Sequence, residues 1–85
     1  MTDTVSTPLQ QAAEGVVVNL VAAWEQAGAR LTLSTLVRVG SRKGFAATMI
    51  RRAVNDLAED EFIALVPDGC EVVVMDPTRD ARARR

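Results

Sequence analysis

Basic side chains gathered in the middle of this 85-residue chain are its clearest chemical feature. No acidic residue lies between Glu25 and Asp56, and the first 29 residues contain no Lys or Arg. The basic residues of the block are Arg30, Arg38, Arg42, Lys43, Arg51 and Arg52. A local positive field attracts polyanions even when the net charge of the chain is only −1. The block therefore predicts a polyanionic partner, and nucleic acid is the leading candidate.

Other chemistries have little support in this sequence. The chain has no His and a single Cys, Cys70, so neither the usual zinc ligand sets nor an internal disulfide can be assembled. A glycine-rich phosphate loop and paired carboxylates in a predicted cleft are also missing. We therefore expect no enzymatic activity, no metal and no cofactor. The cysteine usage favours a reducing cytoplasm, and no apolar run approaches the ~20 residues of a membrane span.

The elements that must position the basic block begin with a long helix. Thr7 is a suitable N-cap, Pro8 suits the first helical position, and Gly28 provides a stop. Between them the apolar residues recur at three- and four-residue spacing, which predicts a helix over 8–27. The stripe comprises Leu9, Ala13, Val16, Val17, Leu20, Trp24 and Ala27. Trp24 lies at its centre, which favours a core role over base stacking.

Two further helices are expected across the basic block. Thr32 can cap a brief helix that ends at Gly40, after which residues 41–44 form a turn. From Phe45 the helical period resumes and runs to about Asp60. The face opposite its apolar stripe carries Thr48, Arg51, Arg52 and Asn55.

Residues 62–75 predict a β-hairpin around Asp68-Gly69, a strong turn signal. Pairing Pro67 with Cys70 places one set of side chains on a common face: Ile63, Leu65, Val72 and Val74. The other face carries Ala64, Val66, Glu71 and Val73 and is more apolar than a solvated hairpin needs. Either the hairpin twists into the core or this face meets a partner. A candidate dimer surface combines Ala64 and Val73 with Val18 and Ala22 of the first helix.

The expected fold is therefore one small α+β domain, a winged helix-turn-helix with three helices and a two- to three-stranded antiparallel sheet. The domain spans residues 7–76. Residues 1–6 are small and polar, and residues 77–85 carry four Arg without an apolar anchor. Both ends are expected to be disordered. The Arg tail is either a solubilising end or an arm that follows phosphates.

The segment FAATMIRRAVNDLAEDEFI, residues 45–63, resembles the recognition helix and wing entry of GntR-like bacterial regulators. The residues that match in register are Thr48, Ile50, Arg51, Arg52, Ala53, Leu57 and Ile63, with Phe45, Val54 and Phe62 as apolar equivalents. The resemblance covers about residues 30 to 76 and implies a winged-helix DNA-binding domain. Glu61 stands where these regulators usually have glycine before the wing. The hairpin also lacks the basic residues of a wing that enters the minor groove.

The same site follows from the physics of the major groove, which accepts a helix whose outward face carries long donors. Arg51 and Arg52 suit guanine edges and Asn55 an adenine edge, while Arg42 and Lys43 at the helix entrance suit phosphates. The expected DNA-binding residues are Arg38, Ser41, Arg42, Lys43, Thr48, Arg51, Arg52 and Asn55.

Two function classes remain open. The first is a sequence-specific double-stranded DNA-binding protein, expected to be a homodimer because paired half-sites supply the contacts that one small module lacks. Such a protein is a small transcriptional repressor or a plasmid or phage partition-type DNA binder. With no effector domain, no small-molecule effector is expected. The alternative is a winged-helix protein-interaction module without DNA binding, which the neutral wing and the outward apolar residues favour.

Overall fold

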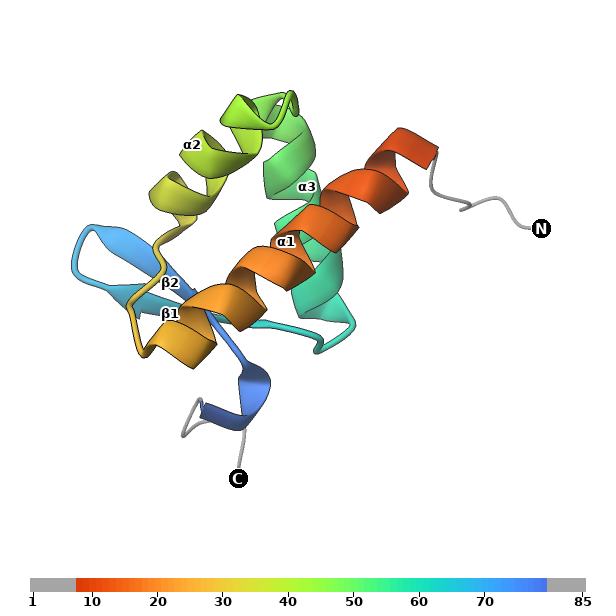
Figure 1. Cartoon of the computed structure of the whole chain (residues 1–85). Coiled ribbons are helices and arrows are strands. Elements are labelled where there is room, and N and C mark those ends of the chain that lie inside the picture. Colours follow the sequence, from red (N-terminus) through yellow and green to blue (C-terminus); the bar gives the residue numbers. More distant parts are fainter. Residues whose placement is uncertain (1–7, 80–85) are drawn as a thin grey trace.

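The computed structural model describes residues 8–79, which fold into three helices followed by an antiparallel hairpin (Figure 1). The elements are α1 Pro8–Ala27, α2 Leu33–Arg42, α3 Ala47–Glu59, β1 Ala64–Asp68, β2 Glu71–Met75 and a 3-10 turn, η1, at Pro77–Arg79. This arrangement confirms the expected small α+β domain with a winged helix-turn-helix layout. The predictions for residues 1–6, for Thr7 as a cap and for Arg82, Arg84 and Arg85 lie outside the described residues.

Helix α1 has the bounds predicted from its apolar spacing. The helix ends at Gly28, which adopts a φ of 68°. The Gly28 N–H donates to the Glu25 carbonyl at 3.1 Å, and the Ala29 N–H donates to the Trp24 carbonyl at 3.0 Å. These two bonds form a Schellman motif, which satisfies carbonyls that a helix end otherwise leaves unpaired.

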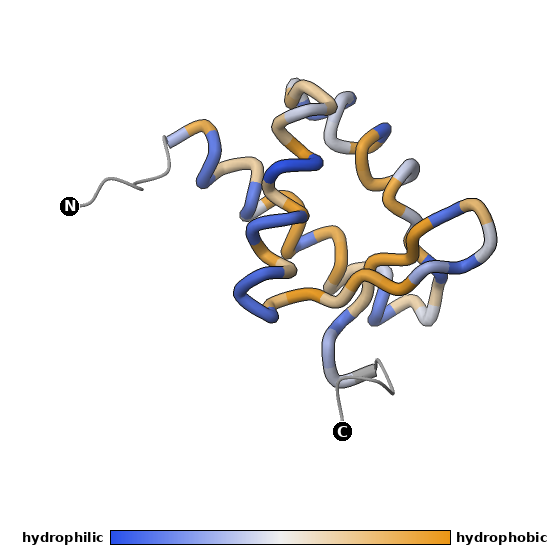
Figure 2. The backbone as a smooth tube through the Cα atoms, turned by 180° about the vertical axis from the view of Figure 1, so that it is seen from behind, coloured by the Kyte–Doolittle hydropathy of each residue, from blue (hydrophilic) through white to orange (hydrophobic). Residues whose placement is uncertain are grey.

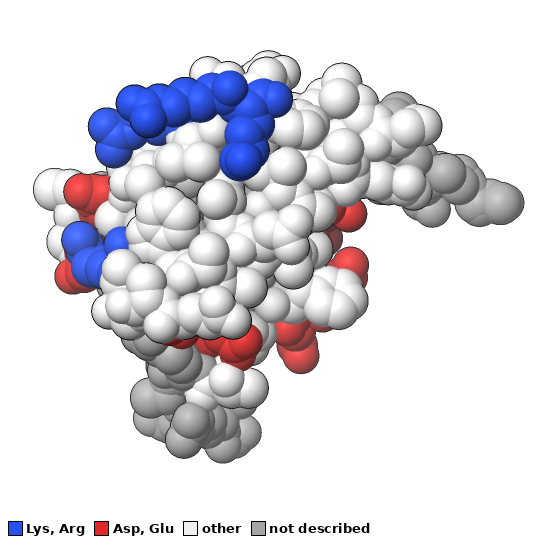
Figure 3. Space-filling model, viewed as in Figure 1, with Lys and Arg blue, Asp and Glu red and all other residues white. Residues whose placement is uncertain are grey.

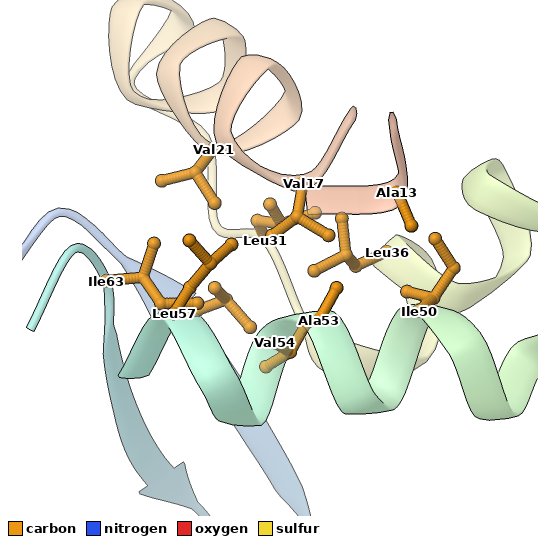
Figure 4. Packing of buried hydrophobic residues seen from close by; sticks show 11 residues of the cluster. Ala13, Val17, Val21, Leu31, Leu36, Ile50, Ala53, Val54, Leu57 and Ile63 are labelled. Atoms are coloured by element: carbon orange, nitrogen blue, oxygen red, sulfur yellow. The ribbon is translucent and has the colours of Figure 1, made fainter. Parts of the chain in front are cut away.

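The core lies where α1, α3 and the hairpin meet α2 (Figure 4). Its buried side chains are Ala13, Val17, Val21, Leu31, Leu36, Ile50, Ala53, Val54, Leu57, Ile63 and Val74. They are aliphatic without exception, and Trp24 is a partly buried residue packed against them, in line with the core role expected for it. In Figure 2 both strands are hydrophobic over most of their length, and hydrophilic residues flank the hairpin turn.

Helix α2 begins as predicted and ends two residues later than predicted. The Thr35 N–H donates to the Thr32 hydroxyl at 3.2 Å, which makes Thr32 the N-cap. Gly40 was expected to stop the helix, but it lies inside it and is buried. A Cβ at this position would lie 2.7 Å from the Ile50 side chain, so Gly40 serves close packing of α2 on α3. The reversal that ends the helix occurs at Gly44, where φ is 97°.

Helix α3 is slightly shorter than expected and ends in a strained turn. Glu61 has a φ of 64° and is the single non-glycine residue of the described chain with positive φ. The Glu61 N–H donates to the Ala58 carbonyl at 3.1 Å and the Phe62 N–H to the Leu57 carbonyl at 2.9 Å. This is again a Schellman motif, with glutamate at the position that favours glycine.

The hairpin forms at the expected place with a different register. Asp68 pairs with Glu71 and Pro67 with Val72, so the two-residue turn is Gly69-Cys70 and the predicted Pro67–Cys70 pair is wrong. Gly69 has a φ of 66°, and Cys70 is not among the residues with positive φ, which matches a Gly-X type II′ turn. A register change of this size preserves side-chain parity, because strand faces alternate with a period of two. Leu65 and Val74 therefore still share one face.

Residues 31–32 add a short third strand segment beside β2. Thr32 forms an isolated antiparallel bridge with Val73, and the Val74 N–H donates to the Leu31 carbonyl at 2.8 Å. This contact twists the hairpin into the domain and leaves Val73 only 7% exposed.

The chain after β2 also differs from the expected disorder from residue 77. The Thr78 N–H and hydroxyl both donate to the Asp76 carboxylate, at 2.8 and 2.6 Å, at the 3-10 turn η1. An aspartate that bonds the backbone two residues ahead is a common way to start such a turn.

Candidate nucleic-acid interface

The expected DNA-binding residues lie on the end of α2, the turn after it and the outer face of α3. Arg38, Ser41 and Arg42 are exposed residues of α2, and Lys43 is its exposed C-cap. A basic residue in the last turn interacts favourably with the negative end of the helix dipole. The α2 part of the interface is therefore compatible with the stability of its own helix.

Helix α3 separates its buried and exposed residues cleanly. The buried residues are Ile50, Ala53, Val54 and Leu57. The four α3 residues that were expected to bind DNA are all exposed: Thr48, Arg51, Arg52 and Asn55. The exposed set spans seven residue steps, or about 10 Å of helix. Because the core holds the opposite face, the rotation of this strip about the helix axis is set by packing.

The basic residues from Arg38 to Arg52 have no ion pair with any described carboxylate. Within that range Arg38, Arg42, Lys43, Arg51 and Arg52 are all exposed. An anion that binds here displaces water from these groups and has no internal partner to displace. We name this group of five basic residues, together with Ser41, Thr48 and Asn55, the basic face.

The backbone at the start of α3 adds to the basic face. Its N-cap, Ala46, has no side chain that can accept a hydrogen bond, and no acidic residue lies in the first turn. Helix N-termini carry a partial positive charge and favour bound anions. These main-chain groups were not among the predicted site residues. The sequence signal for them is the absence of a capping side chain at Ala46.

Acidic residues are kept away from the basic face. Glu59, Asp60 and Glu61 are exposed at the opposite end of α3, and Asp56 is half-buried. In Figure 3 most of the basic side chains lie along the upper edge, a separate basic group lies among acidic side chains at the left margin, and further acidic side chains lie at the lower and right margins. The charge sorting expected from the sequence is thus a spatial separation on the folded molecule.

Arg30 and the hairpin tip lie outside the basic face. The Arg30 guanidinium pairs with the Asp68 carboxylate at 2.7 Å, with both side chains about half exposed. The Ser34 hydroxyl donates to the Glu71 carboxylate at 3.1 Å. These contacts tie the two carboxylates of the hairpin tip to residues 30–34. An exposed ion pair of this kind contributes no more than about 1 kcal/mol.

The four residues proposed for a dimer surface differ in exposure. Val18 and Ala22 are exposed on α1, Ala64 is half-buried, and Val73 is buried against residues 31–32. Little of the Val73 side chain remains available to another molecule. The pair on α1 is the part of this set that offers open surface.

No helix among the described residues is both long and apolar enough to cross a membrane. A comparison with known proteins found no protein-family model, curated protein or solved structure that matches this chain.

Proposed function

We propose that this protein binds double-stranded DNA sequence-specifically, with α3 in the major groove and the turn before it on the phosphate backbone. The observation that carries the proposal is the basic face: five exposed basic residues without an internal ion pair, arranged around the start of a helix that lacks a capping side chain. The resemblance of residues 45–63 to GntR-like regulators supports the same assignment.

The roles within the basic face follow from position. Arg51, Arg52 and Asn55 lie on the exposed strip of α3, where side chains of a groove-bound helix reach base edges. Arg42 and Lys43 end α2, next to the uncapped start of α3, and suit phosphates. The hairpin tip carries Asp68 and Glu71, so the proposal assigns it no phosphate contact.

Regulation of transcription and partition of plasmid or phage DNA both use such a module. We favour a small transcriptional repressor, since a helix bound in the groove of an operator excludes other proteins without any further domain. Selection of binding sites from random duplexes, followed by a search for the selected sequence near the protein's own gene, separates autoregulation from partition.

The test is a salt series with duplex DNA for the unaltered protein and three variants. Affinity is expected to fall steeply with salt, because each neutralised phosphate releases a counterion. Arg51→Ala and Arg52→Ala are expected to cost about 1–3 kcal/mol on the preferred site and to relax the sequence preference. Lys43→Ala is expected to weaken all sequences alike and to lower the salt slope by about one.

Two results would contradict this proposal. Absence of binding to any duplex at low salt removes DNA as the partner and leaves the alternative, a protein-interaction module. Equal loss for all three variants on all sequences refutes the division between base and phosphate contacts.

A further inference from the structure

The fully exposed residues of α1 are uncharged, unlike those of the rest of the described molecule. None of the eleven exposed residues of α1 is charged, whereas eleven of the twenty-four exposed residues between Gly28 and Thr78 are. On the side shown in Figure 3 the surface over most of α1 is correspondingly white. We name this surface, which runs along Ala12, Gly15, Asn19, Ala22 and Gln26, the neutral face.

Two large apolar side chains border the neutral face. Leu9 is 54% exposed and Val18 is 44% exposed, and with Phe62 they are the exposed large hydrophobic residues of the described chain. At 100° per residue, Leu9 and Val18 fall on opposite flanks of the exposed side of the helix. Small central side chains allow the backbone of a second helix to approach closely, and Val18, near the middle of α1, adds apolar area there.

We propose that the neutral face of α1 binds the same face of a second copy of this chain, in an antiparallel pair about a twofold axis near Asn19. A twofold contact requires a surface that is complementary to itself. An uncharged surface meets this condition without like-charge repulsion, whereas the basic faces of two copies would repel each other. The two carboxylates of α1, Glu14 and Glu25, are half-buried and lie off the neutral face, so a partner that relied on charge has no ion pair to form on this face.

The fold leaves the basic face free in such a pair. Helix α1 packs on α3 (Figure 1), and the exposed residues of α3 lie on the side opposite its buried residues. Two copies joined through α1 therefore turn their α3 helices outward. The size of the contact limits its strength, because a 20-residue helix is about 30 Å long and offers less than the roughly 800 Å² per partner of a stable complex. The pair is expected to be weak and reversible.

Sedimentation equilibrium across a concentration series tests the pair without DNA. The buffer contains about 0.15 M salt, which screens exposed charges beyond about 8 Å, and a reducing agent, because Cys70 is an exposed free thiol. We expect a reversible monomer–dimer equilibrium. Asn19→Lys and Asn19→Glu are each expected to weaken it at least about tenfold, since each variant faces its own charge across the axis. An equimolar mixture of the two is expected to form the mixed dimer.

A matched control uses the large apolar residue that lies off α1. Phe62→Glu removes a side chain that is 65% exposed and is expected to leave the dimer unchanged. Lys and Glu have higher helix propensity than Asn, so the Asn19 variants are expected to fold, and circular dichroism verifies this. A monomer at all concentrations up to about 1 mM would overturn the proposal, as would a dimer that both Asn19 variants retain.

The dimer proposal and the DNA-binding proposal are tested by different variants, so either one can be contradicted without the other. Arg52→Ala is expected to dimerise as the unaltered chain does, and the Asn19 variants are expected to keep salt-dependent binding to a single half-site. Loss of dimerisation by Arg52→Ala would place the contact on the basic face and overturn the assignment to α1.

Discussion

At the scale of single residues, Glu61 stands out because it adopts a left-handed backbone conformation that favours glycine. A left-handed backbone costs a residue with a Cβ about 1–2 kcal/mol, and Glu61 adopts it so that the Schellman bonds at the end of α3 can form. The Glu61 position is also where GntR-like regulators usually carry glycine. The backbone angle marks Glu61 as a site of stored strain, at the position where the sequence departs from the pattern it resembles.

Glu61→Gly is expected to stabilise the domain by up to about 1 kcal/mol, since glycine relieves the strain but costs more entropy on folding. Urea denaturation measures the change. The matched control is Glu59→Gly, which removes the same charge two residues earlier inside α3 and is expected to cost roughly 0.5 kcal/mol. Equal effects for the two substitutions would attribute the change to charge and contradict the strain.

At the scale of elements, the packing of α2 on α3 depends on the missing side chain of Gly40. Ile50 is fully buried and lies against this position, so it has little room to move. The angle at which α3 leaves the turn, and with it the direction of the exposed strip, follows from this contact. A substitution at Gly40, which is buried beneath the basic face, is thus expected to alter the geometry of that face.

Gly40→Ala is expected to destabilise the domain by about 1–2 kcal/mol, because overpacking outweighs the gain in helix propensity. Gly15→Ala, on the exposed side of α1 with open space around it, is expected to stabilise by nearly 1 kcal/mol. Thermal unfolding of dilute protein measures both. Stabilisation by both substitutions would mean that Ile50 gives way and that the close contact is not needed.

The elements show which parts of the fold could be predicted from sequence. The bounds of α1 and the cap at Thr32 were predicted because their signals are local: apolar period, capping side chain and stop. The role of Gly40 could not be predicted, because a glycine can either end a helix or permit close packing inside one, and the sequence does not distinguish the two. The hairpin register could not be predicted, because Asp68-Gly69 and Gly69-Cys70 are both acceptable two-residue turns.

The candidate site was predictable to a similar extent. The exposed strip of α3 follows from its helical period, and the structure exposes every residue expected there. The separation of Arg30 from the other basic residues was less accessible, because it depends on where the hairpin tip lies. For Val73 the sequence left two interpretations, a hairpin twisted into the core or a face that meets a partner, and the bridge to Thr32 with the burial of Val73 supports the first.

At the scale of the whole molecule, the net charge conceals two surfaces of opposite character. The basic face and the acidic end of α3 nearly cancel in the sum, and the neutral face of α1 adds nothing to it. Properties that depend on total charge and properties that depend on local field are therefore expected to disagree for this protein.

Ion-exchange chromatography makes this disagreement measurable. A sequence pI of about 5.3 implies that the protein binds an anion exchanger at pH 7 and passes through a cation exchanger. A charged resin, however, contacts only one side of a protein molecule at a time, so the charge of that side determines binding. We also expect the protein to be retained on sulfonate and heparin resins, and Arg52→Ala to elute from them at lower salt. If neither the sulfonate resin nor the heparin resin retains the protein, an open basic face is contradicted. The orientation of the molecule on a charged support is thus set by how its charges are distributed rather than by how many it has.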